Sequence, residues 1–182
     1  ALSEAEHAFQ KVLQQDDKQI EALSNLGVIA LKRQQNQLAV DYFSKALALD
    51  NENTEARNNL AATFMHHDRF ENALMHYDVL LQKDPNNIEY LYNSGVAQMA
   101  LGHLNEAILL FDHVIQLDNT HASTLNNLAA IYIKMEHKEK AQEYLERALA
   151  LNPNDTISAH MLHALTGNKQ AQATPEYAHN LF

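Results

Sequence analysis

An alanine recurs along this chain at a constant interval of 34 residues, and an aromatic residue follows it four places later in four of five copies. The alanines are Ala5, Ala39, Ala73, Ala107 and Ala141, and the residues four places on are Phe9, Phe43, Tyr77, Phe111 and Leu145. A fixed period of this length is typical of units that bury their apolar faces by stacking on their neighbours. The pattern therefore predicts a repeat architecture whose function resides on one of its surfaces.

The composition favours an all-helical chain and excludes several kinds of partner. Apolar residues make up 46% of the sequence and recur at intervals of three and four. The chain has no cysteine for a disulfide or a thiolate metal site, and no apolar run long enough to cross a bilayer. A net charge of -10 disfavours a nucleic-acid backbone as partner. We therefore expect no nucleic acid, membrane or metal partner, and a location in the cytoplasm.

The 34-residue interval divides the chain into four complete units, each predicted to be two helices joined by tight turns. The units are residues 20–53, 54–87, 88–121 and 122–155. Residues 1–19 match only the second helix of a unit, and residues 156–166 predict a terminal capping helix. Residues 167–182 are expected to form a linker and the start of another domain. Because the repeat is broken at both ends, we expect the chain to be part of a longer protein.

One position in the predicted first helices holds only small residues. These are Gly27, Ala61, Gly95 and Ala129. Glycine costs a helix about 1 kcal/mol relative to alanine, so its return at this position indicates close approach of the paired second helix.

Together these positions resemble the tetratricopeptide repeat, with its leucine, glycine, alanine and aromatic signature. The copy closest to that pattern contains Leu91, Gly95, Ala107 and Phe111, and the resemblance extends from residue 1 to about residue 166. It implies an all-α fold, a right-handed superhelical solenoid of helix-turn-helix repeats whose first helices line a concave groove. It also implies binding of a protein or peptide partner.

An asparagine recurs as strictly as the alanine, on the side of each first helix roughly opposite the core stripe. A glutamate precedes it by four residues in three of the four copies. Asparagine offers a donor and an acceptor, so one side chain can hold both the C=O and the N–H of a peptide unit. The alternative is that these asparagines bond locally or were copied with the repeat. The predicted peptide-binding residues are Asn25, Asn59, Asn93, Asn127, Glu21, Glu55 and Glu89.

This asparagine ladder resembles that of tetratricopeptide proteins of the O-linked N-acetylglucosamine transferase type, which bind extended peptides. The resemblance implies that the asparagines hold the backbone of a peptide. The glutamates beside them favour basic side chains in that peptide. No nucleophile–base arrangement or cofactor loop is visible, so we expect neither a catalytic site nor a cofactor in this segment.

Two other functions compete with peptide binding. The segment Thr174–Phe182 resembles the junction before a class I S-adenosylmethionine-dependent methyltransferase domain in bacterial proteins. That resemblance implies a substrate-recruiting part of a methyltransferase, with the catalytic domain and its S-adenosylmethionine beyond residue 182. The second alternative is a self-assembling scaffold, whose copies associate through the exposed ends or the tail.

Overall fold

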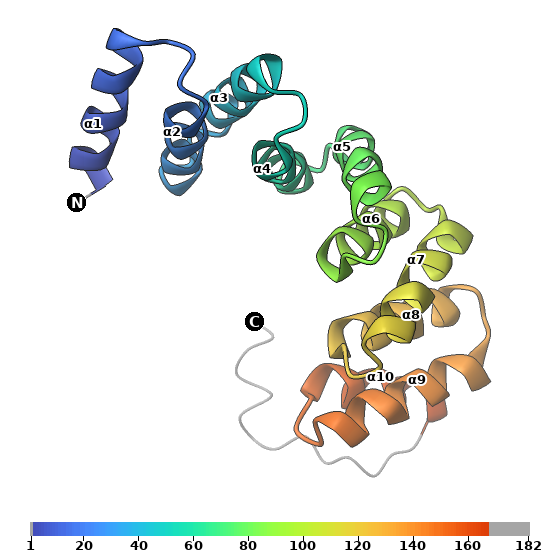
Figure 1. Cartoon of the computed structure of the whole chain (residues 1–182). Coiled ribbons are helices and arrows are strands. Elements are labelled where there is room, and N and C mark those ends of the chain that lie inside the picture. Colours follow the sequence, from blue (N-terminus) through green and yellow to red (C-terminus); the bar gives the residue numbers. More distant parts are fainter. Residues whose placement is uncertain (1, 168–182) are drawn as a thin grey trace. The chain divides into compact units, whose positions relative to one another are not determined.

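The computed structural model describes residues 2–167, and within that range all regular secondary structure is α-helical (Figure 1). The prediction of an all-α repeat fold is therefore confirmed. The predicted methyltransferase-like segment Thr174–Phe182 lies outside the described residues. The helices are α1 (Leu2–Gln15), α2 (Ile20–Lys32), α3 (Asn36–Leu49), α4 (Thr54–Met65), α5 (Phe70–Lys83), α6 (Ile88–Ala100), α7 (Leu104–Leu117), α8 (Ala122–Lys134), α9 (Lys138–Leu151) and α10 (Thr156–Thr166).

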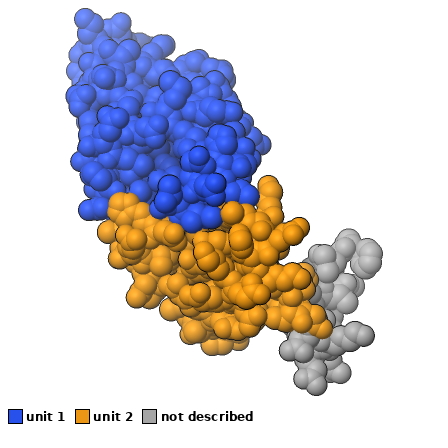
Figure 2. All heavy atoms as spheres, turned by 90° about the vertical axis from the view of Figure 1, so that its right-hand side faces the viewer, with its two compact units in different colours: residues 1–110 blue, residues 111–182 orange. Residues whose placement is uncertain are grey.

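The chain divides into two compact units, residues 1–110 and residues 111–182 (Figure 2). In the first unit, α2 packs on α3 and α4 packs on α5, as the two helices of one repeat. Neighbouring repeats join through contacts of α1 with α2, α3 with α4 and α5 with α6. In the second unit, α8 packs on α9 and α10 packs on α9. Helix α7 spans the division between the units.

The turn inside each repeat closes with the same backbone hydrogen bonds. After α2, the N–H of Gln35 donates to the carbonyl of Ala30 at 2.9 Å, and the N–H of Gln34 donates to that of Leu31 at 2.9 Å. This pair of bonds is the Schellman motif, which requires a left-handed residue just past the helix. The left-handed residues recur every 34 positions, with φ angles of 61°, 53°, 82° and 61°, at Gln34, Asp68, Gly102 and Glu136.

The start of most first helices is fixed by a side-chain cap at another recurrent position. Asn53 accepts a hydrogen bond from the N–H of Ala56 at 2.9 Å, and Asn87 accepts one from that of Tyr90 at 3.2 Å. Such caps satisfy N–H groups that the helix itself leaves unpaired. The cap thereby sets where each first helix begins, and so the direction of the side chains that follow it.

The alanine and aromatic positions of the sequence form the core. From the first complete repeat onward, each alanine and each residue four places later is fully buried. In α1 the matching Ala5 and Phe9 are only half-buried, because no first helix precedes α1 in the described part of the chain. Burying a side chain such as Phe43 contributes about 1.5–3 kcal/mol. The recurrent core therefore holds each pair of helices together.

The described residues contain no helix that is both long and apolar enough to cross a membrane.

Candidate functional site

The predicted asparagines lie at equivalent places, in the second turn of four first helices. Asn25, Asn59 and Asn93 belong to α2, α4 and α6 in residues 1–110, and Asn127 belongs to α8 in the other unit. All four are half-buried. The predicted glutamates lie one turn earlier on the same helix faces, and each is exposed: Glu21, Glu55 and Glu89.

The first of these asparagines is partly engaged by its own helix. The Nδ2 atom of Asn25 donates to the backbone carbonyl of Glu21 at 2.9 Å. A bond of this kind, to the residue four places earlier, is the local alternative that the sequence left open. It occupies one amide proton and leaves the second proton and the side-chain oxygen for another partner.

Asn59 presents its whole amide. Its side chain makes no hydrogen bond to any described residue, and only its backbone carbonyl is engaged, by the Thr63 hydroxyl at 2.6 Å. A half-buried amide with two donor protons and an oxygen can bind both polar groups of one peptide unit. Asn59 therefore has the full capacity that the asparagine hypothesis requires.

Asn93 lies beside a buried phenol. Tyr77 of α5 is fully buried, and burial raises the pKa of its hydroxyl to about 12, with the Asn93 side chain acting in the opposite direction. The Tyr77 hydroxyl has no well-aligned hydrogen bond to any described residue. A buried hydroxyl in that condition costs about 1–3 kcal/mol, so the neighbouring Asn93 amide is its natural partner. Tyr77 thus places a buried hydroxyl of the second repeat beside a predicted site residue.

Glu89 is held in place from the preceding repeat. The Nδ2 atom of Asn58 on α4 donates to Oε1 of Glu89 on α6 at 3.1 Å. The two predicted site residues Asn59 and Glu89 are therefore linked through the side chain next to Asn59 in sequence. Glu21 and Glu55 make no corresponding side-chain bond to a described residue.

The second unit carries the site in a less acidic form. Ser123 occupies the place of the glutamates, one turn before Asn127. Next to it in sequence, Asn126 donates to Asp155 at 3.1 Å and accepts from the Ser158 hydroxyl at 2.6 Å. The position before the recurrent asparagine therefore joins consecutive first helices in both units, through Asn58 in one and Asn126 in the other.

Sequence reasoning missed the supporting residues Tyr77 and Asn58. Tyr77 occupies a position that holds phenylalanine in three of the five copies, so its hydroxyl was the available signal. The doubling of asparagine at Asn58–Asn59 and again at Asn126–Asn127 was the signal for the second role. Neither pattern indicates a role in the sequence alone, because the partner of each side chain lies on a neighbouring helix.

The chemistry of this surface is hydrogen bonding and charge pairing. Amides and carboxylates recur on the first helices, and no group of three His, Asp or Glu side chains in residues 2–167 could hold a metal ion. The face of these first helices therefore presents amide groups that can donate and accept hydrogen bonds, and exposed carboxylates.

Comparison with known families identifies the repeat. One tetratricopeptide repeat model matches residues 30–93 and 98–165, and a second matches residues 2–54. The chain is a tetratricopeptide repeat protein. A search of curated protein sequences gives no match.

Solved structures agree with this assignment of the tetratricopeptide repeat fold. YrrB, described as a TPR protein with an unusual peptide-binding site, superposes with a TM-score of 0.81 at 26% identity, over 87% of this chain and 82% of YrrB. MamA superposes with a TM-score of 0.78 at 20% identity, over 84% of this chain and 89% of MamA. A tetratricopeptide repeat protein from Parabacteroides merdae superposes with a TM-score of 0.82 at 21% identity, over 91% of this chain and 67% of that protein. These relationships support a protein-interaction module.

Proposed function

We propose that this tetratricopeptide repeat protein binds an extended segment of a partner protein along the face that carries Asn25, Asn59 and Asn93. The observation that carries the proposal is the unengaged amide of Asn59, in register with two further asparagines on neighbouring first helices. Each amide matches the donor and acceptor of one peptide unit, so this face binds the backbone of the partner and depends less on its side chains. The likeness to YrrB, a peptide-binding protein, supports this function.

The partner segment carries lysine or arginine. Glu21, Glu55 and Glu89 line the same face and are exposed, in a chain whose net charge is -10. Glu89 is oriented by Asn58, which limits the conformations it has to give up on binding a cation. Complementary charge of this kind raises the rate of association and selects among partners.

Asn127, in the second unit, offers backbone binding without an acidic neighbour. Because Ser123 replaces glutamate there, a peptide bound at Asn127 gains no charge pairing at that position. The preference for basic side chains therefore belongs to the face within residues 1–110.

A pair of labelled peptides tests the proposal by fluorescence anisotropy. The probes are two unstructured dodecapeptides of serine and threonine, one containing four lysines and the other four glutamates. We expect the lysine peptide to bind more tightly, and Asn59→Ala with Asn93→Ala to weaken its binding at least tenfold, since each substitution removes two hydrogen bonds with a net contribution of about 0.5–1.5 kcal/mol per bond and about 1.4 kcal/mol corresponds to tenfold. Glu55→Lys with Glu89→Lys reverses the preference.

The matched control is Asn72→Ala with Asn105→Ala, which removes two asparagines from the second helices α5 and α7. This variant should bind both peptides as the original chain does. A large loss of helical stability in Asn59→Ala alone would instead make that residue structural. Equal binding of the two peptides would refute the preference for basic partners.

The other sequence-based functions remain predictions. Recruitment for a methyltransferase, with S-adenosylmethionine as its cofactor, depends on residues 174–182, and sequencing the reading frame after residue 182 tests it. Self-association through the ends is tested by sedimentation over a range of concentrations. His163 of α10 occupies the register position of Gly27, where the paired second helix approaches closely. This larger side chain disfavours packing of a second copy's helix against α10 in the way that α3 packs on α2.

A further inference from the structure

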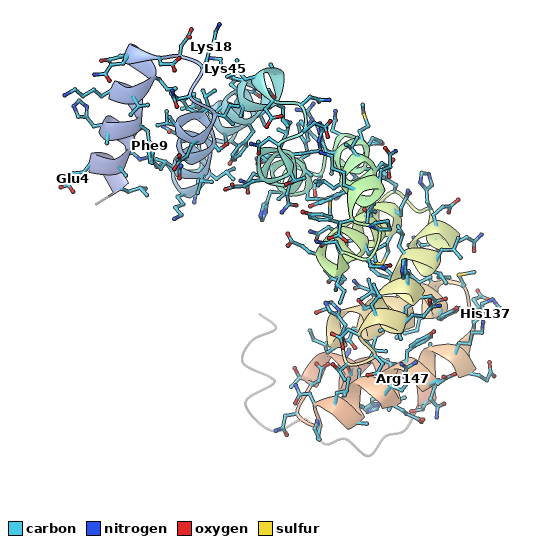
Figure 3. The ribbon with its side chains drawn as sticks, viewed as in Figure 1. Glu4, Phe9, Lys18, Lys45, His137 and Arg147 are labelled. Atoms are coloured by element: carbon cyan, nitrogen blue, oxygen red, sulfur yellow. The ribbon has the colours of Figure 1, made fainter. Side chains whose placement is uncertain are left out.

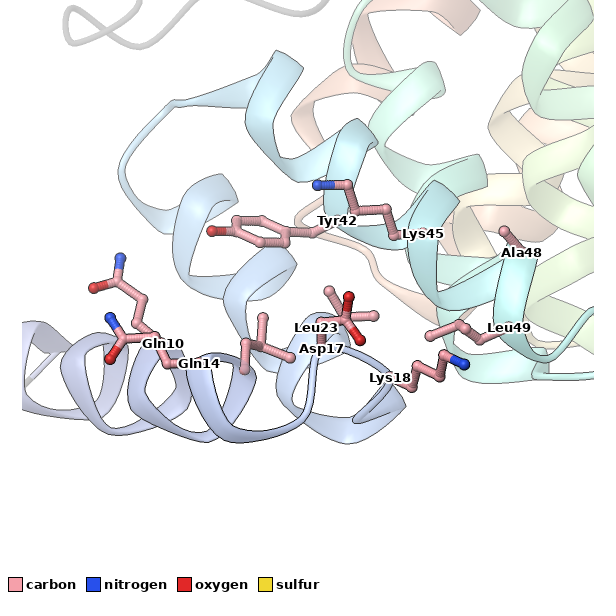
Figure 4. A pocket seen from close by; sticks show the side chains of 10 residues that line it. Gln10, Gln14, Asp17, Lys18, Leu23, Tyr42, Lys45, Ala48 and Leu49 are labelled. Atoms are coloured by element: carbon pink, nitrogen blue, oxygen red, sulfur yellow. The ribbon is translucent and has the colours of Figure 1, made fainter.

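A groove lies beside the second helices α1 and α3 of neighbouring repeats, and none of the predicted asparagines lines it. It has a volume of about 650 Å³ and is lined by residues of α1, α2, α3 and the turn after α1. Figure 4 shows Gln10 and Gln14 on one wall and Tyr42 and Lys45 on the other. We call it the α1–α3 groove, and its lining residues are Gln10, Leu13, Gln14, Asp17, Lys18, Leu23, Tyr42, Lys45, Ala48 and Leu49.

The same site recurs in the second unit. A smaller cavity of about 290 Å³ is lined by Asn119, Thr120, Arg147, Ala150 and Leu151. Each of these residues lies three repeat lengths after a residue of the α1–α3 groove, so Arg147 matches Lys45 and Leu151 matches Leu49. Figure 3 marks the two cations, Lys45 on α3 and Arg147 on α9. Each site thus combines a cation with an exposed leucine, Leu49 at 42% and Leu151 at 45%.

In the second repeat, the chain closes the corresponding positions with its own side chains. Arg57, which takes the place of Leu23, donates through Nη2 to the side-chain oxygen of Asn51 at 2.8 Å. Lys83, which takes the place of Leu49, forms an ion pair with Glu52 at 2.6 Å. Asn51 and Glu52 replace Asp17 and Lys18, so both contacts join one wall of the groove to the other. In the second repeat, the chain's own polar side chains therefore bridge the positions that line the α1–α3 groove in the first.

The open groove differs from the closed one in charge. Lys18 stands where the second repeat has Glu52, and Lys45 stands where it has Val79. The Lys45 side chain makes no hydrogen bond or ion pair with a described residue, and two lysines face the single lining carboxylate of Asp17. The lining is therefore cationic in a protein that is strongly acidic as a whole.

We infer that the α1–α3 groove, and its counterpart at Arg147 and Leu151, bind a partner segment in which a bulky apolar side chain lies next to an aspartate or glutamate. The apolar side chain packs between Leu13, Leu23 and Leu49, and the carboxylate pairs with Lys45 or Lys18. A volume of several hundred cubic ångströms is in the range of pockets that take such groups. The expected ligand is opposite in charge to the one proposed for the asparagine face.

This inference is tested by a variant in which residues that line the α1–α3 groove are replaced by their counterparts from the second repeat. The closed variant carries Lys18→Glu, Lys45→Val and Leu49→Lys, the residues that the second repeat has at these positions, and keeps the buried Leu23. The control variant, Met75→Lys with Leu109→Lys, removes two exposed apolar side chains that line neither groove. The probe is a synthetic array of random dodecapeptides, with the strongest binders remade and titrated by anisotropy.

We expect binders in which leucine, isoleucine or phenylalanine lies within two residues of an acid, and at least a tenfold loss of their affinity in the closed variant. Their affinity should not change in the control variant or in the Asn59→Ala, Asn93→Ala variant, which separates this site from the asparagine face. Binders that are basic, or that bind the closed variant equally well, would overturn the inference. So would a dimer that the closed variant converts to a monomer, because the occupant would then be a second copy.

Discussion

Gly27 of α2 lies directly against the ring of Phe43 of α3, so closely that a Cβ atom on Gly27 would be 2.5 Å from Cε1 of Phe43. The close approach that the small-residue position predicted is therefore confirmed for this repeat. It joins the two helices whose faces carry the asparagine site and one wall of the α1–α3 groove. The contact shows why glycine is retained in the middle of a helix, where it is intrinsically unfavourable.

Gly27→Ala should lower the free energy of unfolding by about 1–2 kcal/mol, although alanine is the better helix former. The fully buried Phe43 ring has to move to admit the methyl group, and overpacking of this kind costs about 1–3 kcal/mol. Urea unfolding followed by circular dichroism measures the change. Gly27→Ala with Phe43→Leu is the control, because Ala129 and Leu145 form that combination at the same register, fully buried. A stabilising single substitution would contradict the steric argument.

Replacing Arg57 by leucine should stabilise the chain by about 1–3 kcal/mol. Arg57 is 7% exposed, its Nε atom has no hydrogen-bond partner in the described residues, and the matching Leu23, Leu91 and Leu125 are buried. A buried charge that is only partly satisfied is often less stable than a well-packed apolar residue. The urea midpoint tests this. Arg57→Ala should have the opposite effect, since it leaves a cavity as well as losing the bonds to Asn51.

The stability of the second repeat should fall as the pH drops below about 6.5. Burial, and after it the neighbouring Arg57, lowers the pKa of His76, so the unfolded chain binds a proton that the folded chain excludes. The free energy of unfolding therefore rises with pH between the folded pKa and 6.5, and is fully recovered above 6.5. Urea midpoints of the original chain and His76→Tyr at pH 5.5 and 7.5 measure the effect. The variant, which matches Tyr42 and Tyr144, should lose less stability on acidification.

Tyr77→Phe should raise the free energy of unfolding by roughly 1 kcal/mol. The substitution removes a buried hydroxyl that lacks a well-aligned partner, and Phe43 and Phe111 are equally buried at this register. Tyr42→Phe is the matched control: Tyr42 is only half-buried, so the substitution should leave stability within about 0.5 kcal/mol of the original. A loss of stability on Tyr77→Phe would show that the bond to the Asn93 amide is strong in solution.

Glycine in place of the left-handed residues Gln34 and Glu136 should stabilise the chain by about 0.5–1 kcal/mol at each position. Both residues have φ of 61°, which costs a residue with a Cβ atom about 1–2 kcal/mol, partly offset by the greater freedom of glycine in the unfolded chain. Thermal and urea unfolding measure the gain. The reverse change, Gly102→Ala, should destabilise, since Gly102 has φ of 82° at the same register. No gain at either position would mean that side-chain contacts offset the strain.

Much of the fold was predictable because repetition makes local signals reinforce one another. The alanine and aromatic positions predicted the helix pairs and the recurrent core, and the buried Ala39 and Phe43 confirm them. The left-handed turn residues were not all predictable: Gly102 gives a signal, whereas Gln34 and Glu136 do not, because the Schellman bonds impose their conformation. The asparagine site residues stay a prediction until binding is measured.

By itself the sequence determined the period, the helical class and the register at which asparagines and glutamates recur, because these depend on spacing along one helix. The tertiary structure decided how equivalent residues differ. Asn25 bonds to its own helix, Asn59 is unengaged and Asn93 lies beside Tyr77. It also decided that a groove lies open in the first repeat, whereas Arg57 and Lys83 bridge the corresponding positions in the second. Each of these differences arises because the deciding side chain comes from another helix or turn, which spacing along a single helix does not report.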